Sequence, residues 1–213
     1  MRALLAVFAG SLALAGAAKA AVLDFTSSAT GAPSGSVAGV AYSIISSGAL
    51  TNAQAQDGGS CAGHGLACQI DGLGVGDDEI TSGAVGTLQT GESLTVTFSQ
   101  QVQLTGVALL DLFYSNRGVE VATISWQGGS TTISASELSN TGLSGFAALN
   151  SLVGVVTNFV SFTAANLFGD DGNNDFAVAA LSFEPVPLPA ALPLFLAGLA
   201  GLGFARGRKR KAA

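Results

Sequence analysis

Apolar and polar residues alternate in short runs through the middle of the chain. In Ser93–Phe98 (SLTVTF) every second residue is apolar, which places Leu94, Val96 and Phe98 on one face of an extended strand. Similar runs recur, and Gly, Asn and Asp residues that favour turns separate them. They predict strands at 22–26, 37–46, 79–81, 84–88, 93–98, 102–114, 119–126, 131–135, 159–163 and 176–183.

One of these runs, 102–114, is long and apolar, and Gly106 within it predicts a bulge or a break. Helical periodicity is scarce, and we expect only a turn or two of helix at 136–138 and 146–152. Many short strands separated by turn residues predict an all-β fold, a single domain of the β-sandwich or jelly-roll kind.

The N-terminal end has the three parts of a secretory signal peptide. Met1 and Arg2 form a short positive region, and residues 3–16 form an apolar one. The sequence Ala-Lys-Ala at 18–20 fits the small-x-small pattern that precedes cleavage. We therefore expect a signal peptide at 1–20, with cleavage between Ala20 and Ala21.

The C-terminal end carries no charge from residue 185 to residue 205. Prolines at its start disfavour helix, so we expect a transmembrane helix at about 190–205. A basic tip at 206–211 follows, and such a cluster stays cytoplasmic and stops transfer: Arg206, Arg208, Lys209, Arg210 and Lys211. On the residues alone, a plain membrane anchor remains open.

A short motif precedes this helix, formed by Val186, Pro187, Leu188, Pro189 and Ala190. Followed by the apolar run and the basic tip, it resembles the VPLPA-CTERM sorting signal, a variant of the PEP-CTERM signals of Gram-negative-type bacteria. The resemblance implies that an exosortase-type membrane protease recognises 186–190 and cuts near it. The chain would then consist of a signal peptide (1–20), a body (21–184) and a temporary sorting tail (185–213).

The body is strongly acidic. All 14 acidic residues of the chain lie in it, with Arg117 as its one base, which leaves a net charge of −13. Such a body does not bind nucleic acid or anionic lipid through charge. Its carboxylates either bind divalent cations or keep an exported protein soluble.

Cys61 and Cys68 are the only cysteines, and they bracket a glycine-rich octapeptide, CAGHGLAC. An even cysteine count in an exported chain predicts a disulfide. The alternative, a Cys/His metal site, needs further ligands, and His64 is the only histidine.

A calcium site is the other candidate for bound metal. Residues 170–175 (DDGNND) offer oxygen ligands before a predicted strand, and Asp24 lies on the first strand. In the jelly-roll carbohydrate-binding domains that such a fold would resemble, a calcium ion often ties the first strand to the last. This predicts Asp24, Asp170 and Asp175 as ligands, whereas the alternative is that these loops are only polar turns.

Nothing in the sequence predicts an enzyme. The body lacks a Gly-x-Ser-x-Gly elbow, and its single histidine falls between the two cysteines. Tyr114, Arg117 and Trp126 are candidates for a ligand-binding rim, although the segment around Arg117 is better interpreted as a turn in which Arg117 pairs with an acid.

Two functional hypotheses follow, and a third, an envelope hydrolase that uses two of the many carboxylates, stays open because spacing alone cannot pair carboxylates across strands. The first is an exported, exosortase-processed protein of the cell surface or extracellular matrix, with a non-catalytic structural or interaction role. The second is a calcium-stabilised carbohydrate-binding module that acts on extracellular polysaccharide. In both, the membrane is a partner only through the C-terminal helix before processing, and nucleic acid is not a partner.

Overall fold

The computed structural model describes residues 20–27, 33–51, 61–76, 79–82, 91–150, 152, 154–165, 174–186, 195 and 198. Residues 19–186 form one compact unit; the second unit, 1–18 with 187–213, lies almost wholly outside the described residues. The strands of the first unit are β1 (Ala21–Asp24), β2 (Ser34–Val37), β3 (Val40–Ser46), β4 (Leu50–Thr51), β5 (Gly74–Val75), β6 (Ser93–Leu110), β7 (Phe113–Tyr114), β8 (Val121–Trp126), β9 (Gly129–Ser134), β10 (Glu137–Leu138), β11 (Ala147–Leu149), β12 (Val155–Ala164) and β13 (Ala177–Pro185).

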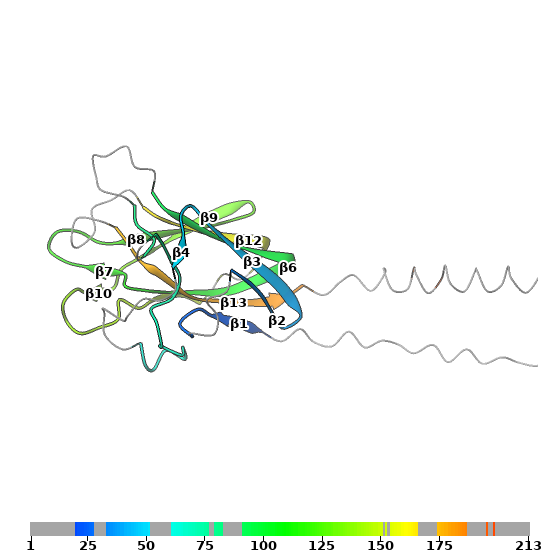
Figure 1. The fold of residues 1–213 in the computed structure, drawn as a ribbon, viewed down its shortest axis with the longest axis horizontal. Helices are drawn as coiled ribbons and strands as arrows, with labels where there is room; N and C mark the ends of the chain where they lie inside the picture. Colours follow the sequence, from blue (N-terminus) through cyan, green and yellow to red (C-terminus); the bar gives the residue numbers. More distant parts are fainter. Residues whose placement is uncertain are drawn as a thin grey trace, which may run out of the picture. The chain divides into compact units, whose positions relative to one another are not determined.

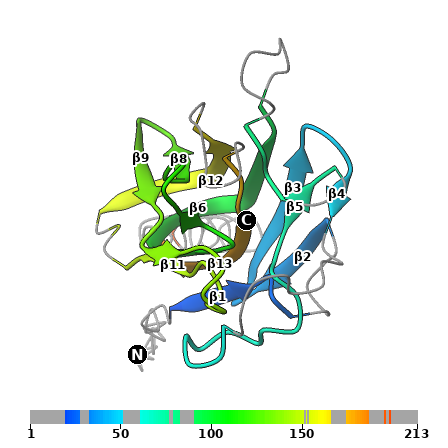
Figure 2. The same ribbon diagram turned by 90° about the vertical axis from the view of Figure 1, so that its left-hand side faces the viewer.

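Nine of these strands form one sheet, in the order β1-β13-β6-β12-β8-β9, with β2, β3 and β11 joined beside this path. Figure 2 shows the sheet curling around the interior, from β1 and β13 through β6 to β12, β8 and β9. The pairs β4–β5 and β7–β10 are small separate sheets. The prediction of an all-β fold is confirmed for the described part of residues 20–186, which contains no helix.

Strand β6 joins the two halves of the sheet. Its first part pairs with β3 and β12, and its second part pairs with β13 and β11 (Figure 1). Gly106 lies at a register shift against β13, so the predicted bulge is confirmed. Leu104 is buried before this bulge and Val107 after it, because the extra residue exchanges the two faces of the strand.

One large hydrophobic core lies inside the curled sheet and draws on β1, β3, β6, β8, β9, β12 and β13. Phe98 of β6 and Phe183 of β13 meet there with ring centroids 4.9 Å apart. The two halves therefore pack on a shared core, as in a β-sandwich, although they belong to one continuous sheet.

Several local predictions were wrong, and residues 79–81, predicted as a strand, form none. The strand predicted at 93–98 and most of the one predicted at 102–114 are the single strand β6, because the chain passes from one half of the sheet to the other without a turn, and Phe113–Tyr114 form the separate strand β7. The strand predicted at 37–46 is confirmed from Val40 on as β3, but it starts too early, because Val37 ends β2 and the chain turns at Ala38 and Gly39 with φ of 50° and 79°. Helical turns were expected at 136–138 and 146–152, but β10 and β11 lie there, since pairing with β7 and β6 outweighs local propensity.

The first and last strands are neighbours. β1 pairs antiparallel with β13, so Ala21 lies opposite Phe183 and Val22 opposite Ser182 (Figure 1). β13 itself lies between β1 and β6. The body therefore starts and finishes at one end of the same strand pair.

No helix among the described residues is long and apolar enough to cross a membrane. The predicted span at 190–205 lies outside them except for Phe195 and Gly198, whose backbones are helical. The basic tip at 206–211 and the signal peptide up to residue 19 lie outside the described residues as well.

Candidate functional site

The predicted disulfide is present. Cys61 and Cys68 are bonded, with their Cα atoms 5.7 Å apart. The bond closes an eight-residue loop that turns through Gly63 and Gly65, both at positive φ. The alternative of a Cys/His metal site is excluded for these two sulfur atoms, because they are bonded to each other.

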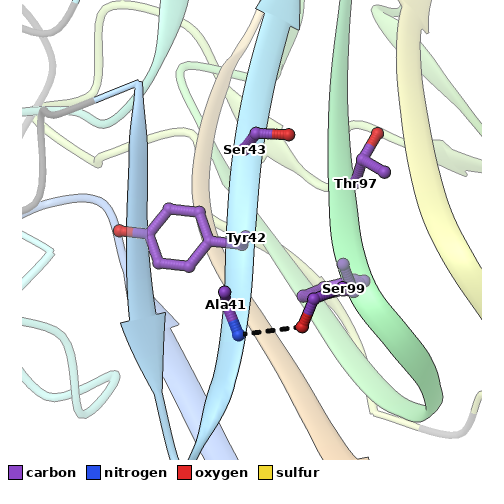
Figure 3. A pocket seen from close by; sticks show the side chains of 6 residues that line it. Ala41, Tyr42, Ser43, Thr97 and Ser99 are labelled. Atoms are coloured by element: carbon purple, nitrogen blue, oxygen red, sulfur yellow. Dashed lines mark hydrogen bonds between the residues drawn. The ribbon is translucent and has the colours of Figure 1, made fainter.

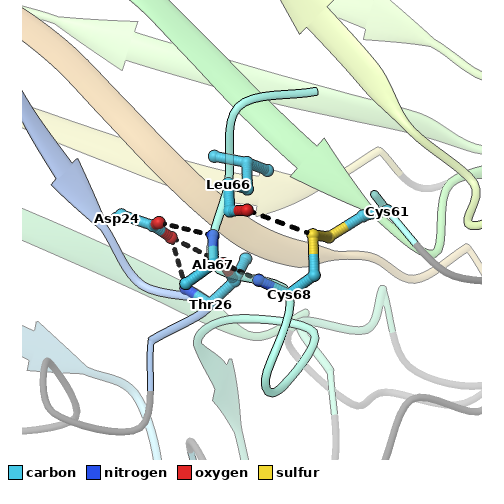
Figure 4. Close-up of a disulfide and its surroundings, with 6 residues drawn as sticks. All are labelled: Asp24, Thr26, Cys61, Leu66, Ala67 and Cys68. Atoms are coloured by element: carbon cyan, nitrogen blue, oxygen red, sulfur yellow. Dashed lines mark hydrogen bonds between the residues drawn. A yellow bond between two sulfur atoms is a disulfide. The ribbon is translucent and has the colours of Figure 1, made fainter. Parts of the chain in front are cut away.

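The loop is held to the end of β1 by hydrogen bonds (Figure 4). The Ala67 amide donates to Asp24 Oδ2 at 2.8 Å, and the Cys68 amide donates to Thr26 Oγ1 at 2.9 Å. The Thr26 hydroxyl in turn donates to Asp24 Oδ1 at 2.6 Å, and the Thr26 carbonyl accepts from the amides of Gln69 and Ile70. Thr26 is fully buried, so it is the centre of this attachment.

The loop covers part of the outer surface of the sheet. Cys61, Leu110 and Ala179 form a small second hydrophobic cluster, with Leu66 packed against it. His64 stacks on Phe146 with ring centroids 3.7 Å apart and an interplanar angle of 10°. We call the segment 61–70 the disulfide cap, and its role here is to shield the β6–β13 strand pair from water.

The structure does not bring the three predicted rim residues together. Tyr114 lies opposite Val119 in an isolated bridge, while Trp126 lies at the far end of β8. Seven residues of extended chain between Val119 and Trp126 span about 23 Å. Trp126 instead packs against the core, and its indole ring lies against Gly129 across the β8–β9 hairpin.

The segment around Arg117 is a turn, as the alternative interpretation held. The Ser115 amide donates to the Gly118 carbonyl at 2.9 Å, and the Arg117 amide donates to Ser115 Oγ at 3.0 Å. The Arg117 side chain is exposed. No ion pair of Arg117 with an acid occurs in the described part of the chain, so that half of the interpretation is not supported.

The predicted calcium ligands are only partly described. Asp170 lies outside the described residues, and no group of three or more His, Cys, Asp or Glu side chains within the described ranges could hold a metal ion. Asp24 uses both carboxylate oxygens in the hydrogen bonds to Thr26 and Ala67. In the structure, Asp24 therefore helps to hold the disulfide cap in place.

Asn174, next to the predicted ligand Asp175, has an unexpected structural role. It is fully buried, and its side chain accepts from the Val121 amide at 2.6 Å and donates to the carbonyls of Val121 and Ala165 at 2.8 and 2.6 Å. It thereby joins the chain before β13 to the start of β8 and the end of β12. The buried position of Asn174 follows from its backbone pairing with Ser82, which no sequence pattern indicates.

The outward face of strands β2, β3, β8, β9, β12 and the first part of β6 consists mainly of serine and threonine. Register aligns these residues in rows across the strands, for example Ser161 between Thr95 and Ser125. The remaining outward positions hold Ala, Ile, Val, Phe, Asn and Gln, and none is charged. We call this surface the hydroxyl face: Ser34, Ser36, Ser43, Ser93, Thr95, Thr97, Ser99, Thr123, Ser125, Ser130, Thr132, Ser134, Ser161 and Thr163.

The hydroxyl face is hollowed between β3 and β6. An open pocket of about 210 Å³ lies there, lined by Ala41, Tyr42, Ser43, Thr97, Phe98 and Ser99 (Figure 3). The Ala41 amide donates to Ser99 Oγ at 3.2 Å on one side of it. The Tyr42 ring turns away toward β2 and lies against Gly35, so it is not the exposed aromatic platform that a sugar site would use.

No protein-family model matches the chain, and no curated protein matches it. Among solved structures, it is similar to CBM32-3 from a family 31 glycoside hydrolase of Clostridium perfringens, with 13% sequence identity. The match covers 70% of this chain and 76% of that chain, with a TM-score of 0.28. At that TM-score the likeness establishes neither a shared fold nor a shared ligand.

Proposed function

We propose that the chain is an exported protein that an exosortase-type protease releases or transfers to the cell surface or the extracellular matrix. Its body would act there without catalysis, as a structural or interaction module. The N-terminal signal pattern and the motif at 186–190 motivate the proposal.

The pairing of β1 with β13 is the observation that supports it most. The ordered strands occupy the interval between the two expected cuts, since β1 starts at Ala21 and β13 stops at Pro185. Cuts after Ala20 and near Val186 would remove no residue of the core sheet. Both new ends would lie at the same end of one strand pair.

The disulfide cap is consistent with this destination. Disulfides persist in oxidising compartments outside the cytoplasm, and the cap is built around one. The cap shields apolar residues of β6 and β13, so the disulfide supports the same strands that lie next to the sorting motif.

Intact mass of the protein from its native host tests the proposal. We expect a product in the medium or on the surface that begins at Ala21 and ends near the motif at 186–190. Extra mass on that product would identify the acceptor. A Pro187→Ala, Pro189→Ala variant should keep its tail and stay in the membrane. A wild-type protein that keeps residue 213 and stays in the membrane would overturn the proposal in favour of a plain anchor.

A further inference from the structure

We propose that the hydroxyl face is a docking surface for a neutral polysaccharide. The proposal rests on the proposed function, because the matrix to which the body would be sorted supplies the polysaccharide. It names the surface that makes the contact and the chemical class of the partner.

Charge argues for a neutral partner. The body has a net charge of −13, yet no outward position on the six strands of the hydroxyl face is charged. A polyanion would be repelled by the body, and a polycation would be drawn to its acidic loops instead of this face. A neutral chain can approach the face without stripping water from any charged side chain.

The face also matches the hydrogen-bonding chemistry of a polyol. Each hydroxyl can donate one hydrogen bond and accept others, and it rotates to suit its partner. The rows repeat at about 4.8 Å across the strands and about 6.6 Å along them. Thr95 Oγ1 and Ser161 Oγ are 2.9 Å apart, so neighbouring hydroxyls within a row lie close enough to share one ligand hydroxyl. Many weak contacts along a polymer add up to stable attachment.

Apolar side chains complete the surface. Ile45 is 66% exposed and lies beside Thr95 in register, and the half-buried Phe159 lies beside Thr97. Sugar rings have apolar C–H faces that pack on such side chains while their hydroxyls bond to polar neighbours. The pocket at Ser43 and Thr97 gives the chain a concave place to enter.

Affinity electrophoresis of the full chain in a non-glycosidic detergent tests this docking surface. Native gels would contain dextran, galactomannan or mixed-linkage β-glucan as neutral probes, and alginate as a polyanion. The test variant Thr97→Val, Thr163→Val removes two outward hydroxyls while keeping side-chain shape. The matched control Thr131→Val, Ser136→Ala removes two hydroxyls that are not on the face.

We expect at least one neutral probe to retard the wild type, the test variant to bind at least tenfold more weakly, and the control to stay within twofold. Thermal melts of both variants should match the wild type, which shows that folding is intact. Retardation by alginate alone, equal binding by the test variant, or no retardation by any neutral probe would overturn the inference. So would a dimer seen by sedimentation that the test variant disrupts, because the occupant of the face would then be a second copy.

The mass measurement is independent of the binding test. A processed body that binds no glycan refutes only this inference, and an unprocessed chain that binds glycan refutes only the proposed sorting.

Discussion

Replacing Thr26 by Val should destabilise the body by about 3 kcal/mol. Val has the same shape as Thr, so the change removes the hydroxyl and little else. It removes the 2.6 Å hydrogen bond to the Asp24 carboxylate and the 2.9 Å acceptor of the Cys68 amide. A bond to a charged group contributes about 1.5–3 kcal/mol, and an orphaned buried amide costs about 1–3 kcal/mol.

The assay is thermal unfolding followed by far-ultraviolet circular dichroism, with the disulfide oxidised. For a domain of this size a loss of 3 kcal/mol lowers Tm by about 6–12 °C. Thr26→Ser is the matched control because it keeps the hydroxyl and loses one methyl group, at a cost of about 1 kcal/mol. A Tm for Thr26→Val within about 1 °C of the wild type would refute the idea that Thr26 holds the disulfide cap.

Reduction of the disulfide provides a second test of the same attachment. A loop whose cysteines are seven residues apart contributes about 2.5 kcal/mol by chain entropy. Thr26 and the Cys61–Cys68 bond hold one segment, so their losses should not add. We expect the reduced Thr26→Val variant to lose at least about 1 kcal/mol less stability than the sum of the two separate losses. Either change alone already weakens the attachment of the loop, so the second change removes less. Strict additivity would mean that the two act independently.

Three further predictions concern other parts of the body. Asn174→Asp should cost at least about 3 kcal/mol in urea unfolding, because it replaces a buried donor with an acceptor that faces two carbonyl oxygens; a cost under 1 kcal/mol would contradict its bridging role. Gly145→Ala should cost about 3 kcal/mol, since a Cβ there meets the Leu112 nitrogen at 2.5 Å and φ is +61°, whereas Gly142→Ala, with open space around it, should cost about 1 kcal/mol. A four-residue Gly-Ser spacer after Pro185 should speed tail removal in the host, followed by pulse-chase, because β-pairing runs up to Pro185, one residue before the motif begins; unchanged kinetics would show that the protease needs no greater distance from the sheet.

The sequence predicted the all-β class, the disulfide and the Gly106 bulge because each leaves a local signal: period-two alternation, paired cysteines and a glycine within a strand. It did not predict that β6 is one strand, because the passage from one half of the sheet to the other depends on which strands lie beside it.

The candidate surfaces show the same limit. Tyr114 and Trp126 were candidates for one rim because aromatic side chains often bind sugars, but the extended β8 places them far apart. The hydroxyl face was missed because its members are ordinary strand residues spread over six strands. Only register brings them together.

The place of β13 between β1 and β6 also sets the timing of folding. For a chain that crosses a membrane from its N-terminus, β1 emerges first and yet has no sheet partner until residue 177 has followed. The sheet of the body would therefore remain incomplete during nearly the whole of this passage, which keeps the chain extended enough to cross the membrane. If export proceeds as proposed, the sheet would close only when the stretch next to the predicted stop-transfer segment arrives, and completion of the fold would coincide with the arrest of export.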